Sequence, residues 1–206
     1  MAISFDSGSQ TTSTFQTSWT HTCDASATFL FVALNLFSGT PAVTYNSVPM
    51  TAGPSTGTLK TFYLFNPASG ANTVSVTGGS PTDSVAASYI GTSTSALDAS
   101  GTTTQSGAAG SHTASITTTV DNCWAVMAFA LDTTSTLNAG TATTQRAWAN
   151  QARAIAIFDS DTPKTPAGSV TLALTVGSAG SSGRWAKISI APEVSTSSNS
   201  GFLAIL

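Results

Sequence analysis

Charge is scarce in this sequence. Only 7% of its 206 residues are Asp, Glu, Lys or Arg, whereas about a quarter are charged in ordinary soluble domains. The six Lys and Arg residues are scattered along the chain, so no basic patch can neutralise nucleic-acid phosphates or anionic lipid headgroups. The composition therefore argues against nucleic-acid and membrane partners.

Residues that carry acid-base or nucleophilic chemistry are also few. The two histidines, His21 and His112, lie in no recognisable motif, and a Ser close to a His is uninformative in a chain so rich in hydroxyl groups. Glycoside hydrolysis usually needs two carboxylates, yet the single glutamate, Glu193, falls in a polar linker. The sequence predicts a protein that is not an enzyme and needs no cofactor.

No hydrophobic run is long enough to cross a bilayer. The longest apolar stretch, residues 27–37, is interrupted by Thr28 and Asn35 and is much shorter than the roughly 20 residues of a membrane-spanning helix. The first residues, MAISFD, contain neither the charged nor the apolar region of a secretory signal. We expect a soluble chain that, if it works outside a cell, leaves it by lysis or inside a particle.

Ser, Thr, Ala and Gly fill the place of the missing charges, beside 41% hydrophobic residues, and this apolar content is enough to drive folding. Apolar and polar residues alternate over 15–23 with the period of a strand. Residues 27–37 are apolar on both faces, which predicts a central strand covered on both sides. Turns rich in Gly and Pro separate further expected strands, at residues 43–45, 48–50, 58–65, 72–77, 84–90, 113–120, 123–131, 153–158, 169–176 and 184–190. This pattern is typical of an all-β, antiparallel, jelly-roll-like β-sandwich.

Residues 1–191 are predicted to form one such domain, with a long loop over about 92–111, where Ser, Thr, Gly and Ala dominate. Two smaller sandwiches joined at this stretch are the alternative. One domain is favoured because the strand at 27–37 needs cover on both faces. Residues 141–152 have mixed propensity and are left open between a strand and a short helix.

A polar linker and an apolar tail are predicted over residues 192–206. The tail ends in FLAIL, and burying these side chains would contribute roughly 25 cal/mol per Å² of apolar area. They are expected to form a final strand of the domain's own sheet or to insert into a neighbouring subunit or scaffold. The residues predicted to bind a partner in this way are Phe202, Leu203, Ile205 and Leu206.

No metal site is predicted, although weak candidates exist. Asp159 and Asp161 follow an expected strand and are interpreted as solvated turn residues, with a calcium site as the alternative. A zinc site could draw its ligands from two strands, but the spacing fits no compact zinc motif, the residues being His21, Cys23, His112 and Cys123. The two cysteines are otherwise interpreted as buried small apolar side chains, or as a disulfide between distant strands.

The tryptophans are candidates for stacking against sugar rings. Trp124 and Trp185 fall within expected strands and are predicted to be core residues. Trp148 has polar companions in RAWANQ, residues 146–151. It is therefore the candidate residue for a glycan-binding site.

Four segments resemble a jelly-roll-like β-sandwich that recurs in phage virion proteins and in bacterial surface proteins: WTHTC, VTYNSVPMT, YLFNPASGANTVSV and GRWAKISI, at residues 19–23, 43–51, 63–76 and 183–190. The resemblance covers nearly the whole chain. These residues belong to the framework of strands and hairpins, so no catalytic residue is carried over.

The resemblance implies a virion component, assembled in the host cytoplasm. We expect a phage capsid decoration or cement protein, forming a homotrimer, that binds the major capsid protein and stabilises the head. The alternative that it implies is a carbohydrate- or receptor-binding module of a phage fibre or spike, with Trp148 as the residue to test.

Overall fold

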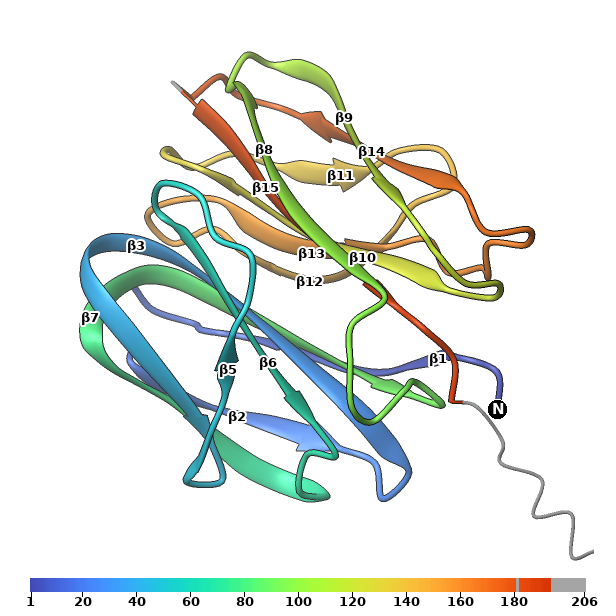
Figure 1. The fold of residues 1–206 in the computed structure, drawn as a ribbon. Helices are drawn as coiled ribbons and strands as arrows, with labels where there is room; N and C mark the ends of the chain where they lie inside the picture. The colour runs from blue at the N-terminus through green and yellow to red at the C-terminus, as the bar shows by residue number, and fades with distance from the viewer. Residues whose placement is uncertain (181, 194–206) are drawn as a thin grey trace, which may run out of the picture.

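The computed structural model describes residues 1–180 and 182–193. These residues form antiparallel strands and turns (Figure 1), and they contain no helix able to cross a membrane. The predicted all-β sandwich is confirmed. The strands are β1 (Ser4–Gln10), β2 (Ser18–Cys23), β3 (Ala27–Tyr45), β4 (Val48–Pro49), β5 (Thr51–Ala52), β6 (Leu59–Phe65), β7 (Gly70–Ile90), β8 (Ala99–Ser106), β9 (Gly110–Thr117), β10 (Trp124–Leu131), β11 (Leu137–Ala139), β12 (Thr144–Ala149), β13 (Ile155–Asp159), β14 (Ser169–Val176) and β15 (Ser182–Ile190).

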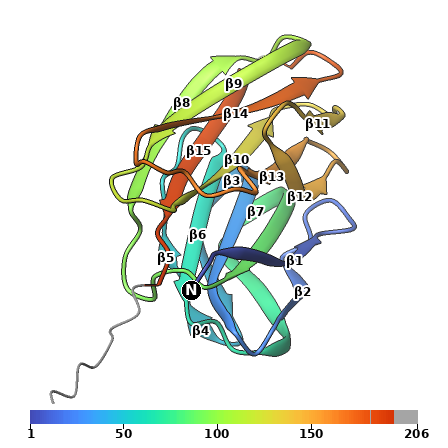
Figure 2. The same ribbon diagram turned by 90° about the vertical axis from the view of Figure 1, so that its right-hand side faces the viewer.

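Three sheets stack on one another (Figures 1 and 2). The first has the order β1-β7-β3-β6-β5, with β2 paired to β7 and β4 paired to β3. The second has the order β12-β13-β10-β15-β8, and the third β11-β14-β9. The second sheet lies in the middle, because its side chains enter two cores, one shared with each neighbouring sheet.

The central strands are apolar on both faces because each face meets a different core. Every residue of β10 is buried. Val126 and Ala128 pack towards the first sheet, whereas Met127 and Phe129 pack towards the third, as the alternation of a strand requires. The first half of β3 behaves in the same way, so the predicted cover on both sides is confirmed over residues 27–36, whereas Phe37 is 63% exposed.

The first sheet folds over on itself, since β3 and β7 are long strands that bend together. Their pairing shifts register near Gly39, where φ is +94°, and Gly78 has φ of +69°. A Cβ on Gly39 would lie 2.5 Å from the Gly78 carbonyl oxygen, so glycine permits this close approach. The two halves of the folded sheet enclose a third core, which gives four layers of strands in all.

Several predicted elements differ from the observed ones. The loop predicted over 92–111 is wrong in its middle, because β8 occupies Ala99–Ser106 and pairs with β15. The unassigned stretch at 141–152 contains β12. The strands expected at 72–77 and 84–90 are the two halves of the single strand β7.

Antiparallel strands bring their connections to two opposite ends of the molecule (Figure 1). At one end the amino nitrogen of Met1 donates a hydrogen bond to the Glu193 carbonyl oxygen, at 3.3 Å; we call this the terminal end. At the other end lie the β1–β2 loop at 11–17, the bend of β3 and the β12–β13 turn at 150–154. We call this the turn end.

Candidate functional site

Trp148 lies on β12 near the turn end. Ala147 and Ala149 on either side point into the core, so the alternation of the strand directs the indole outward, and 39% of Trp148 is exposed. The ring lines a groove of about 240 Å³ together with residues of the β1–β2 loop and the β12–β13 turn. The other lining residues are Gln10, Thr11, Thr12, Ala149, Asn150 and Gln151.

A second groove, of about 410 Å³, adjoins the first and shares Gln10 and Thr12 with it. It runs along β2, which contributes Ser18, Trp19 and Thr20, and it is also lined by Gln16 of the β1–β2 loop and Thr73 of β7. None of the residues that line the two grooves is charged. We call the pair the turn-end grooves.

A buried carboxylate fixes the turn that forms one wall of the turn-end grooves. Asp83 of β7 is 1% exposed and accepts hydrogen bonds from the backbone N–H groups of Gln151, Ala152 and Arg153, at 2.6, 3.1 and 2.8 Å. The side chain of Asn35 also donates to the Ala154 carbonyl oxygen, at 3.3 Å. The first sheet therefore holds this turn of the second sheet in one position.

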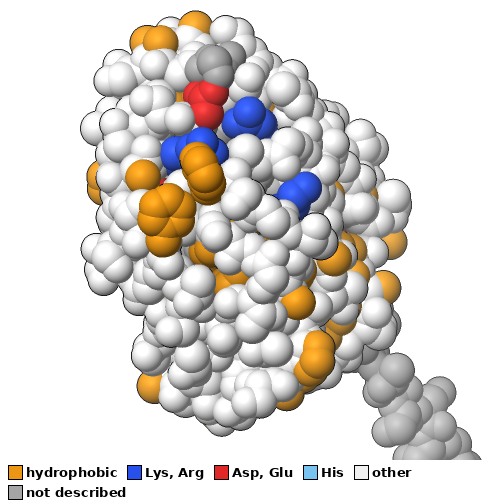
Figure 3. Space-filling model, turned by 90° about the vertical axis from the view of Figure 1, so that its left-hand side faces the viewer, with side chains coloured by type: hydrophobic (Ala, Val, Ile, Leu, Met, Phe, Trp, Pro, Cys, Tyr) orange, Lys and Arg blue, Asp and Glu red, His pale blue; other side chains and the backbone are white. Residues whose placement is uncertain are grey.

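Two more exposed aromatic residues lie at the turn end. Phe15 is 51% and Phe37 63% exposed, and their rings meet edge to face with centroids 6.1 Å apart. The Arg153 guanidinium lies over the Phe37 ring, at 5.7 Å from its centroid. Figure 3 shows hydrophobic side chains gathered beside Lys or Arg on a face that is otherwise largely uncharged.

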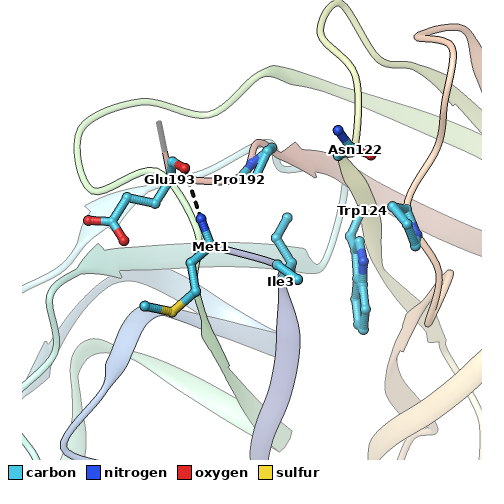
Figure 4. Close-up of a pocket in the computed structure, with 8 residues that line it drawn as sticks. Met1, Ile3, Asn122, Trp124, Pro192 and Glu193 are labelled. Carbon is cyan, nitrogen blue, oxygen red and sulfur yellow. Dashed lines mark hydrogen bonds between the residues drawn. The ribbon is translucent and has the colours of Figure 1, made fainter. Parts of the chain in front are cut away.

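The terminal end carries a pocket of about 400 Å³. Ile3 and Trp124 contribute its apolar wall, and Met1 and Glu193 also line it (Figure 4). Trp124 is 6% and Trp185 0% exposed, so the prediction that both are core residues is confirmed. The predicted partner-binding residues lie outside the described part of the chain, namely Phe202, Leu203, Ile205 and Leu206.

The structure places Asp159 and Asp161 around a guanidinium. The Arg146 Nε donates to Asp159 Oδ2 at 2.7 Å, and the same side chain forms an ion pair with Asp161. The side chain of Asp159 is fully buried, so its interpretation as a solvated turn residue is wrong. Arg146 lies where a calcium ion between the two carboxylates would have to bind, and its planar charge also covers the Phe5 ring, at 4.4 Å from the centroid.

His21 lies in a buried network of hydrogen-bonded polar side chains. Its Nδ1 lies 2.8 Å from Ser9 Oγ and its Nε2 3.0 Å from Ser88 Oγ, while Ser88 Oγ donates to Asp6 Oδ2 at 2.6 Å. Burial lowers the pKa of His21 to about 4, against the opposing charge of Asp6. A hydroxyl thus separates the carboxylate from the imidazole, unlike a catalytic triad, in which the two bond directly. Nothing in the sequence marks these serines, because hydroxyl groups are abundant throughout.

The two cysteines are buried and free. Their interpretation as small apolar side chains is confirmed, and the alternative of a disulfide is wrong. Burial raises the pKa of both thiols, that of Cys123 to about 11. His112 lies in the third sheet against Phe129, whereas His21 and Cys23 lie on β2 of the first sheet, so the structure does not bring the four candidate zinc ligands together. Residues 1–180 and 182–193 contain no cluster of three or more metal-ligating side chains.

No protein-family model matches this chain, and no curated protein shows significant sequence similarity to it. The two ends of the sandwich differ in the surfaces that they present. The terminal end has a pocket lined by Met1 and Glu193, which are hydrogen-bonded to each other. The turn end has exposed aromatic rings and uncharged grooves.

Proposed function

We propose that this protein is a structural component of a phage particle, a capsid decoration protein that binds the major capsid protein through its terminal end and stabilises the head. The observation that best supports this is the convergence of both described chain ends at one end of a four-layer stack. Met1 and Glu193 are hydrogen-bonded there, and the Glu193 N–H donates to the Gly91 carbonyl oxygen at 2.8 Å. Glu193, after which the tail begins, is therefore held in one position at the terminal end.

The sequence of residues 194–206 has the order that an anchor requires, a spacer followed by an apolar group. A polar spacer precedes the apolar residues 202–206, and the nine peptide units between Glu193 and Phe202 span at most about 30 Å. The apolar side chains can therefore reach beyond the sandwich to the surface of a shell. Their burial there would contribute roughly 25 cal/mol per Å², and each copy in a symmetric trimer would bring its own anchor.

Packing and buried hydrogen bonds make the sandwich rigid. The middle sheet packs against a core on each face, and buried polar groups such as Asn35 and Asp83 join the first sheet to the second. A cement protein stabilises a shell because its binding free energy favours the assembled state. A rigid body transmits that stabilisation without first losing entropy of its own.

Binding to purified capsid shells of the phage that encodes this chain tests the proposal. One variant replaces the four apolar side chains Phe202, Leu203, Ile205 and Leu206 with serine. The matched control replaces the polar spacer residues 197–200 with glycine, which changes as many positions and keeps the apolar group. Thermal unfolding first establishes that both variants are folded.

We expect the apolar variant to bind the shells at least about tenfold more weakly than the unaltered chain, since each 1.4 kcal/mol lost is a factor of ten. The spacer control should bind as the unaltered chain does. Equal attachment of both variants would remove the anchor from the proposal, and failure of the unaltered chain to bind would overturn the proposal itself.

A further inference from the structure

We propose that the turn-end grooves bind a neutral oligosaccharide, with Trp148 as the surface on which a sugar ring stacks. The site lies at the opposite end of the sandwich from the terminal-end pocket (Figure 1). A copy attached through its terminal end would thus present the grooves outward. The inference does not depend on that attachment, because it uses only residues of the grooves themselves.

Trp148 provides the apolar part of the site. The register of β12 forces its indole out of the core, which leaves 39% of a large aromatic residue in water beside a groove. A pyranose ring has one face of C–H groups, which pack against the electron-rich face of an aromatic ring. Stacking would bury the area of Trp148 that the fold leaves exposed.

Amide and hydroxyl groups provide the polar part. Gln10 and Thr12 stand between the two grooves and line both of them, while Asn150 and Gln151 follow Trp148 along the chain. Carboxamides and hydroxyls both donate and accept hydrogen bonds, as sugar hydroxyls do. The groove along β2, of about 410 Å³, falls in the range of about 300–1,000 Å³ typical of small-molecule sites. The groove beside Trp148, of about 240 Å³, is slightly smaller than that range.

The charges around the grooves favour a neutral ligand. No Lys or Arg lines them, and the nearby Arg153 is held over Phe37, with its Nη1 donating to the Leu36 carbonyl oxygen at 2.9 Å. The chain has a formal net charge of -3, which repels anionic ligands at long range. Glycans with carboxylate or sulfate groups would find no paired cation here.

The wall that carries Trp148, Asn150 and Gln151 is fixed before any ligand binds. Asp83 holds three successive backbone N–H groups of this turn, and Asn150 Oδ1 accepts from the Ser135 N–H at 2.9 Å. A preformed site loses little conformational entropy on binding. Asp83 is therefore a positioning residue for the grooves.

A glycan array tests this inference with the full-length chain. The array carries neutral hexose and N-acetylhexosamine oligosaccharides beside sialylated, sulfated and uronic-acid glycans. We expect binding to members of the neutral set. Absence of binding to every neutral glycan, or binding confined to the acidic ones, would overturn the proposal.

Variants then locate the site with the best neutral oligosaccharide as the probe. Trp148→Ala should weaken binding at least about tenfold, as the loss of an aromatic anchor typically does, and Gln10→Ala should weaken it as well. Trp148→Phe keeps an aromatic face and should restore part of the affinity. The matched control is Val120→Ala, another exposed hydrophobic residue, 47% exposed and outside both grooves.

Unchanged affinity of the Trp148→Ala variant would overturn the assignment, as would equal losses in the Val120→Ala control. Since Trp148 is outside the core, the variants should keep the thermal stability of the unaltered chain. Capsid binding is measured separately with variants of residues 202–206, so either proposal can fail without the other.

Discussion

Acidification should weaken the fold through His21. The imidazole is fully buried between the two halves of the folded first sheet, and burial lowers its pKa from an ordinary 6.5 to about 4. The folded protein therefore binds this proton more weakly than the unfolded chain does. The stability contributed by neutral His21 is present above about pH 6.5 and is lost as the pH falls towards about 4. The difference between the two pKa values corresponds to roughly 3 kcal/mol.

Urea unfolding at about pH 7.5 and about pH 4 measures this loss. His21→Gln removes the ionisation but keeps a side chain that can hydrogen-bond to Ser9 and Ser88. The unfolding free energy of the unaltered protein should fall by roughly 3 kcal/mol more than that of this variant between the two pH values. The difference between the two proteins isolates His21, because the carboxylates titrate in both. Equal losses in the unaltered protein and His21→Gln would refute the reasoning.

Three further predictions concern buried polar groups. Arg146→Ala leaves the buried Asp159 carboxylate unpaired and should lower the unfolding free energy by about 3–5 kcal/mol; an unchanged value in urea would contradict the ion pair's structural role. Asp83→Ala leaves three backbone N–H groups without their acceptor and should lower it by at least about 2 kcal/mol, and a fully stable variant would show that the turn is held otherwise. Cys23 and Cys123, buried and with raised pKa values, should resist a thiol reagent in the native protein and react once it is denatured, whereas fast labelling of the native protein would contradict their burial.

The strands that could be predicted are those whose own residues show the apolar pattern of a strand. β10 and the first half of β3 are apolar on both faces, and β14 and β15 were expected within two residues of their observed bounds. β8 was missed because its sequence, ASGTTTQS, has almost no apolar residue. It is a strand because β15 offers it a complete row of partners, and tertiary pairing of this kind overrides local propensity.

The candidate site was predictable only in part. The polar neighbours of Trp148 indicated its exposure, but Gln10 and Thr12 reach it from the first sheet. Their approach depends on Gly8, where a Cβ would lie 2.1 Å from the Arg146 carbonyl oxygen. The burial of Asp159 was equally hidden, since a carboxylate at a strand end is usually solvated and only the fold brings Arg146 to it.

The central claim, that this chain is a repeated structural component of a phage head, is tested most directly by a mass-spectrometric protein inventory of purified virions, with copy numbers relative to the major capsid protein. We predict that the chain is present in a fixed and high ratio to the major capsid protein, as repeated attachment to the shell requires. Absence from the particle would contradict the claim, and a few copies per virion would assign the chain to a fibre or spike instead.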